Sequence, residues 1–224
     1  MSRSPRVAAT PPRPFAMITA GIDALLPLSL LEAVRGVDTP IDHLDTEVVP
    51  ELQNKRFGLS DTVYAQIRRY ADTRRKGQRV PLDEVVALAR LIGRRPDAEQ
   101  VFRAAGRHLA RQAYGALPGA TRAMARGLPA LVSRPIALRG VRRVAERYFD
   151  GTVRRLGDSI ILSVPAAVTA DAAPGPAAAA FYEAGLRELL QQLTGHDAAV
   201  QLVKFAARDA GISEWRAEWR APAA

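Results

Sequence analysis

His43 is the residue whose neighbours most resemble a metal site, because Asp42 and Asp45 place two carboxylates close to its imidazole. A divalent cation could use such a set of oxygen and nitrogen ligands. Acidic residues in this arrangement are also common in polar loops that precede a helix. We favour the loop interpretation, so the sequence predicts no metal site.

The other two histidines fall in or next to expected helices. His108 lies in a stretch with helical spacing of apolar residues, and a histidine on a helix could serve as a haem ligand. It also lies between Arg107 and Arg111, where a partly exposed polar residue is the simpler interpretation and the one we favour. His196 directly follows Gly195, which we expect to end a helix, so we interpret it as a helix-terminal residue. No cofactor is predicted.

The sequence contains none of the short motifs that mark common catalytic sites. It has no Gly-x-Ser-x-Gly, no His-Glu-x-x-His, no P-loop and no Gly-x-Gly-x-x-Gly. Its 224 residues include no cysteine, which excludes disulfides, thiolate metal sites and cysteine nucleophiles. We therefore predict that the protein is not an enzyme.

Charge gives the strongest signal in the sequence. The chain has 32 Lys and Arg residues against 23 Asp and Glu residues, a formal net charge of +9. Residues 1–54 carry a net charge of −3, residues 55–155 of +15 and residues 156–224 of −3. We favour a solvated basic face on which some arginines pair with the acidic flanks, within the chain or across a dimer. The alternative is binding to nucleic acid or to an anionic membrane surface.

The arginines of this positive middle concentrate in two places. One set falls at the end of an expected helix, where cations complement the helix dipole. The other alternates with apolar residues in a basic amphipathic helix. The aromatic residues fall on expected core faces, which argues against a platform for stacked bases. The predicted basic surface comprises Arg68, Arg69, Arg74, Arg75, Arg139, Arg142, Arg143 and Arg147.

Helices are expected through most of the first 150 residues. Apolar spacing predicts them over 22–34, 61–76, 81–92, 97–117, 120–130 and 136–149. Ser60 is a candidate N-cap for the second helix, and Pro27 could split the first. We predict a disordered arm over 1–14, a helical N-terminal region over 15–95 and an α+β domain over 96–224.

After residue 150 the spacing becomes typical of strands. Two β-rich runs over 152–156 and 159–164 flank Gly157 and Asp158, which predicts a hairpin. A loop over 165–176, a helix over 177–193 and two strands over 200–205 and 212–219 follow. The last strand alternates so that Trp215 and Trp219 share one side. No run of 18 apolar residues occurs, so we expect no membrane span and a cytoplasmic protein.

Four segments of the C-terminal half carry a resemblance to a known family. They are VFRAAGR at 101–107, GDSIIL at 157–162, FYEAGL at 181–186, and the stretch over 208–219. Together they resemble the 4-vinyl reductase domain, whose fold is shared by haem-nitric-oxide-binding domains and by TRAPP vesicle-tethering subunits. The resemblance covers roughly residues 97–220. The helical N-terminal half is similar to a related myxobacterial family of unknown function.

The resemblance implies a scaffold that binds small molecules or proteins and is often dimeric. Many 4-vinyl reductase domains carry cysteines in the last helix and strands, whereas this chain has none. The haem-binding relatives carry a Tyr-x-Ser-x-Arg motif for the haem propionates, and this motif does not occur here. The metal, thiol and haem chemistry of these relatives is therefore not expected.

We predict an α+β protein in which a helical N-terminal half packs on a small antiparallel sheet with a C-terminal helix–strand–strand unit. The expected function is non-catalytic binding or scaffolding, as a homodimer or with a protein partner. A small apolar ligand pocket or an interface would use four residues, for which core packing is the favoured alternative. These residues are Phe181, Leu189, Trp215 and Trp219.

Overall fold

The computed structural model describes residues 21–39, 58, 60–173, 175–206 and 211–218. Its helices are α1 (Leu25–Asp38), α3 (Asp61–Arg75), α4 (Leu82–Gly93), α5 (Ala98–Gly115), α6 (Gly119–Gly127), α7 (Ala130–Val144) and α8 (Ala180–Thr194). A π-helical turn (Ala145–Phe149) continues α7, and a 3-10 turn (Gly175–Ala178) precedes α8. The strands are β1 (Ile22–Asp23), β2 (Arg79–Val80), β3 (Thr152–Leu156), β4 (Ser159–Val164), β5 (Val200–Lys204) and β6 (Ser213–Glu218).

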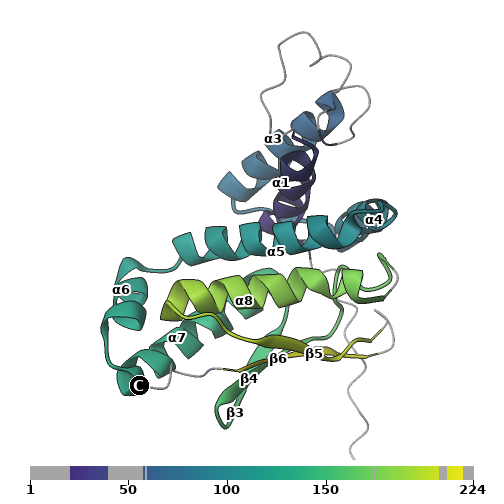
Figure 1. Ribbon diagram of the computed structural model, residues 1–224. Coiled ribbons are helices and arrows are strands. Elements are labelled where there is room, and N and C mark those ends of the chain that lie inside the picture. Colours follow the sequence, from purple (N-terminus) through teal and green to yellow (C-terminus); the bar gives the residue numbers. More distant parts are fainter. Residues whose placement is uncertain (1–20, 40–57, 59, 174, 207–210, 219–224) are drawn as a thin grey trace, which may run out of the picture.

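Helices α5 and α8 lie side by side through the middle of the molecule, with α1 and α3 beyond α5 and the sheet beyond α8 (Figure 1). The two helices approach so closely that glycine is required at their crossing. A Cβ atom on Gly106 would lie 2.1 Å from the carbonyl oxygen of Phe181, well inside van der Waals contact. Gly185 on α8 is also crowded, since a Cβ atom there would lie 3.3 Å from the Gly106 carbonyl oxygen of α5 and 2.9 Å from the ring of Phe149. This seam therefore depends on two residues without side chains.

The main sheet has four antiparallel strands in the order β3-β4-β6-β5. The Gly157–Asp158 turn joins β3 to β4, and Gly157 has the left-handed φ of +58° that such turns need. Ile160, Leu162 and Trp215 face inward, because each is buried and they align across β4 and β6. Helix α8 covers the β5–β6 side of this inner face, and α7 contacts β3 at the other edge.

The predicted α+β class is confirmed, and the element boundaries are close to those expected. Ser60 caps α3 by accepting a hydrogen bond from the Val63 amide at 3.4 Å. Pro27 does not split α1, since it lies in the first turn, where backbone N–H groups have no helical partner. The break expected before residue 136 is wrong: α7 begins at Ala130 and runs through the exposed Pro135.

The buried core continues across the domain boundary predicted between residues 95 and 96. Leu25 and Val34 of α1 belong to the same cluster of buried side chains as Leu109 of α5 and Leu189 of α8. Helix α5 makes this possible, because it contacts α1 on one side and α8 on the other. The predicted arm over 1–14 lies outside the described residues.

Candidate functional site

Three of the four residues predicted for a ligand pocket or interface are core residues. Phe181, Leu189 and Trp215 are each 0% exposed. Helix α8 is enclosed by α5 on one side and the sheet on the other, so its apolar residues are buried all round. Trp215 packs against Tyr182 with ring centroids 4.8 Å apart. The structure thus places these three inside the core and away from any open surface, and Trp219 lies outside the described residues.

The histidines do not assemble into a described site. His43 and its neighbours Asp42 and Asp45 lie outside the described residues. His108 is partly buried on α5, and burial lowers the pKa of its imidazole. His196 is exposed just after α8. Within the described ranges, no group of three histidine, aspartate or glutamate side chains is placed to hold a metal ion.

The predicted pairing between the positive middle of the chain and its acidic flanks is present in the structure. Six arginines from residues 55–155 form ion pairs with carboxylates from residues 1–54 or 156–224. These pairs are Arg95–Asp38 at 2.6 Å, Arg103–Glu183 at 3.0 Å, Arg111–Glu188 at 2.8 Å, Arg134–Asp158 at 4.0 Å, Arg147–Asp23 at 3.4 Å and Arg154–Glu214 at 3.3 Å. Folding therefore brings part of the positive middle into contact with its acidic flanks.

The eight arginines predicted as one basic surface are divided between two places. Helix α3 lies on the far side of α5 from α7 (Figure 1), so the two sets do not form one continuous surface. On α3, Arg69 pairs with Glu84 and Arg75 with Asp72, while Arg74 bonds the Gln112 side chain and Arg68 is exposed. Near α7, Arg142 bonds the Val153 carbonyl oxygen, Arg147 pairs with Asp23, and Arg139 and Arg143 are exposed.

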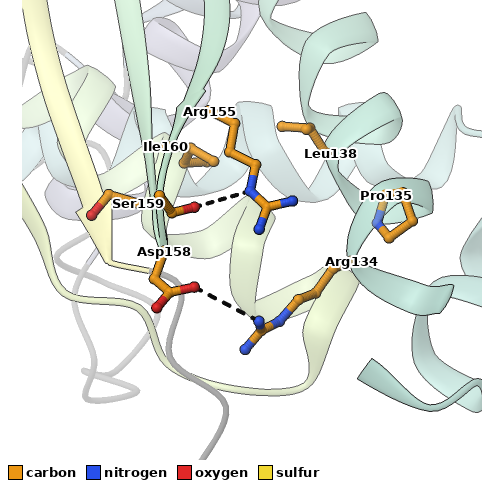
Figure 2. A pocket seen from close by; sticks show the side chains of 8 residues that line it. Arg134, Pro135, Leu138, Arg155, Asp158, Ser159 and Ile160 are labelled. Carbon is orange, nitrogen blue, oxygen red and sulfur yellow. Dashed lines mark hydrogen bonds and ion pairs between the residues drawn. The ribbon is translucent and has the colours of Figure 1, made fainter. Parts of the chain in front are cut away.

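A groove between the β3–β4 turn and α7 brings together two arginines that the sequence alone did not connect. Figure 2 shows this hairpin groove, which is lined by Arg134, Pro135 and Leu138 from α7 and by Arg155, Gly157, Asp158, Ser159 and Ile160 from the hairpin. Arg155 is opposite Ile160 in the ladder and so lies on the inner side of the sheet, facing α7. Its neighbour Arg154 lies on the outer side and pairs with Glu214.

The hairpin groove carries more positive than negative charge. The Arg155 Nε donates to the Gly157 carbonyl oxygen at 2.9 Å, which leaves its charge uncompensated. Arg134 has its nearest carboxylate oxygen, on Asp158, at 4.0 Å, and the Asp158 side chain is 82% exposed. An exposed pair at this distance is weak. Arg134 therefore has one weak carboxylate contact, and Arg155 bonds a neutral carbonyl oxygen.

The shape of the hairpin groove suits a small charged group with an apolar extension. Its cavity volume is about 60 Å³. Pro135, Leu138 and Ile160 supply apolar surface beside the two guanidinium groups. Arginine stays protonated in proteins, so these side chains can bind and orient an anion but cannot exchange protons with it.

A larger cavity of about 460 Å³ lies among α1, α3 and α4. Leu31, Val63 and Leu88 contribute to its lining, and Gln66 adds a buried side-chain oxygen without a hydrogen-bond donor. Its charged groups satisfy one another: Glu84 pairs with Arg69 and accepts a hydrogen bond from the Tyr70 hydroxyl at 2.5 Å. Burial raises the pKa of Tyr70. Among the described residues that line this cavity, the charged groups are Arg69 and Glu84, and they pair with each other.

Comparison with known proteins finds no family whose model matches the chain and no curated protein that matches it. The resemblance to the 4-vinyl reductase domain and the expected homodimer therefore stay predictions. No described helix is both long and apolar enough to cross a membrane.

Proposed function

We propose that this protein is a non-catalytic binding protein and that the hairpin groove takes up an amphipathic anion. The ligand class is a carboxylate or phosphate group attached to an apolar chain. The observation that carries the proposal is the pair of guanidinium groups, Arg134 and Arg155, that lies beside apolar side chains with one weak carboxylate partner. The wider proposal of a scaffold of the 4-vinyl reductase type rests on the sequence resemblance.

The free donors of Arg155 support recognition of an anion. Among the described residues, its one hydrogen bond is from Nε to the Gly157 carbonyl oxygen, and a guanidinium carries five N–H donors. Its terminal nitrogens can therefore bond both oxygens of a carboxylate or phosphate, the geometry in which arginine binds anions most strongly. The Asp158 side chain is 82% exposed, so an incoming anion can displace its weak contact with Arg134 at little cost.

Nucleic-acid binding through one arginine surface is less well supported. The arginines of α3 and α7 lie apart, and several are already paired with carboxylates. A nucleic-acid site needs a continuous cationic track that can neutralise successive phosphates. The hairpin groove, in contrast, needs only the two cations it contains.

Isothermal titration calorimetry with octyl phosphate, octanoate and octanol tests the proposal. We expect the two anions to bind more tightly than the alcohol. Arg155→Gln should weaken octyl phosphate binding about tenfold, since it removes a charge-assisted contact. Arg154→Gln is the matched control, because its side chain lies on the opposite face of the same strand. Equal binding of octyl phosphate by wild type and Arg155→Gln would refute the proposal, as would an equal loss in both variants.

A further inference from the structure

The stretch that forms α6 and α7 is basic without any acidic residue. From residue 100 to residue 145 the sequence has nine arginines and no aspartate or glutamate. Six of these arginines lie in residues 119–144, which we call the α6–α7 corner. They are Arg122, Arg126, Arg134, Arg139, Arg142 and Arg143. Helices α6 and α7 contact each other across the short link at Leu128 and Pro129.

The charges of these arginines are hardly compensated by folding. In the described part of the chain, only Arg134 of the six lies within 4.0 Å of a carboxylate. Arg126 donates to the Gln192 carbonyl oxygen at 2.9 Å and Arg142 to that of Val153 at 3.1 Å, and both acceptors are neutral. Arg139 and Arg143 are exposed. The corner therefore presents cationic charge that remains available to an anionic partner.

Large apolar side chains are exposed among the same arginines. Met124, Leu128 and Val132 are 42%, 39% and 49% exposed, and they follow one another at four-residue intervals around the corner. Such residues on a water-facing surface are usually scattered singly, whereas these three lie within nine residues. Exposure of aliphatic side chains to water is unfavourable. A surface that combines them with uncompensated arginines therefore points to a partner that is both anionic and apolar.

We propose that the α6–α7 corner docks onto the surface of an anionic lipid bilayer. The arginines would contact lipid phosphates, and Met124, Leu128 and Val132 would enter the boundary between head groups and acyl chains. A duplex or single-stranded nucleic acid fits less well, because its phosphates give aliphatic side chains no apolar partner. The nearby aromatic ring, Tyr114, is already contacted by Arg122 and Arg126, whose guanidinium carbons each lie 5.6 Å from its centroid.

This docking surface goes beyond the proposed function and does not depend on it. The hairpin groove would bind a single molecule, whereas the α6–α7 corner would bind a lipid surface. Arg134 belongs to both regions, so the two proposals are separated by variants at Arg155 and at Arg139 with Arg143. Arg155→Gln should leave membrane binding unchanged, and a loss of octyl phosphate binding in that variant would have no bearing on the corner.

Co-sedimentation of the full chain with lipid vesicles tests the proposal. We expect binding to phosphatidylcholine vesicles that contain about one quarter phosphatidylglycerol, at about 0.1 M salt, and little binding to phosphatidylcholine alone. The double variant Arg139→Gln, Arg143→Gln should lower the partition coefficient by about 25-fold, since each arginine near an anionic surface contributes about fivefold. Leu128→Ser with Val132→Ser should also lower it, with the lipid charge unchanged.

The matched control is Arg68→Gln with Leu91→Ser, which removes an exposed arginine and an exposed leucine from α3 and α4. This variant should bind vesicles as the wild type does. An equal loss in the control would overturn the proposal, as would the absence of binding to the anionic vesicles. If the variant Leu128→Ser with Val132→Ser binds vesicles normally while the wild type shifts duplex DNA, the corner is a nucleic-acid surface and the lipid proposal fails. If the wild type is a dimer that the serine variants convert to a monomer, the corner is an interface between copies.

Discussion

The α5–α8 seam and the α6–α7 corner both contain many arginines, but they use them in different ways. In the seam, Arg103 and Arg111 pair with Glu183 and Glu188 of the facing helix. In the corner, arginines contact carbonyl oxygens or are exposed beside apolar side chains. The nine arginines of residues 100–145 therefore fall into two populations, one paired across the seam and one in the corner whose charge is hardly compensated by described carboxylates.

The spacing of the arginines explains the behaviour of the seam. Arg103, Arg107 and Arg111 recur every four residues along α5, so they form one stripe that faces α8. Burial raises the pKa of the Glu188 carboxyl, but hydrogen bonds from Arg111 and Gln192 more than compensate, so this pKa lies below its usual range. A carboxylate held in this way belongs to the packing of the two helices.

The largest effect on stability should come from the helix crossing in the seam. Gly106→Ala places a methyl group against the α8 backbone, which cannot move like a side chain, so we expect a loss of about 3 kcal/mol. Gly127→Ala in the corner meets no atom within 4 Å and should change stability by less than about 1 kcal/mol, toward greater stability. Urea unfolding of the two variants measures the difference. Similar midpoints for both would show that the seam is not closely packed at this position.

A smaller difference in stability should separate Glu188, a carboxylate of the seam, from Asp158, a carboxylate of the hairpin groove. Glu188→Gln removes the charge from a side chain that is 8% exposed and leaves Arg111 without its partner, so we expect a loss of about 1.5 kcal/mol. Asp158→Asn removes an exposed carboxylate from the edge of the hairpin groove and should change stability by less than about 0.5 kcal/mol. Denaturant unfolding at neutral pH compares them. A larger loss of stability in Asp158→Asn than in Glu188→Gln would show that the ion pair of the hairpin groove stabilises the fold more than the pair of the seam.

The same comparison predicts a dependence on pH. The folded-state pKa of Glu188 is lowered, so its contribution to stability is fully present above its unfolded value of about 4.3 and is lost as pH falls through the folded pKa. The wild type should therefore lose more stability between pH 5 and pH 3 than Glu188→Gln, by about 1 kcal/mol at most. Urea midpoints across this range, with Asp158→Asn as the control, test the expectation. Parallel curves for wild type and Glu188→Gln would contradict it.

Local signals in the sequence were sufficient to predict most of the elements. The Gly157–Asp158 turn and the Ser60 cap depend on residues close together in the chain, and the structure contains both. The segment charges also predict some ion pairs between the middle of the chain and its flanks, but they do not predict the partner of each arginine. Which arginine meets which carboxylate depends on how α5 packs against α8, and spacing along the chain does not contain that information.

The hairpin groove could not be predicted in this way. Arg134 and Arg155 are 21 positions apart, on a helix and a strand that meet only through tertiary packing. A signal did exist, because Arg155 alternates onto the inner side of a predicted strand, where an arginine is unusual. Phe181 and Leu189 of α8 are buried, as the favoured interpretation of core packing predicts, because the helix is enclosed by α5 on one side and by the sheet on the other.

The smallest effect on stability should come from the corner arginines. Arg139→Gln with Arg143→Gln removes two exposed charges that form no described ion pair, so thermal or urea unfolding should change by less than about 0.5 kcal/mol. Removal of two like charges from a crowded basic surface relieves repulsion, so any change should be toward greater stability at low salt and should disappear as salt screens it. A clear destabilisation would instead mean that these arginines support the fold as those of the seam do, and the division into two populations would fail.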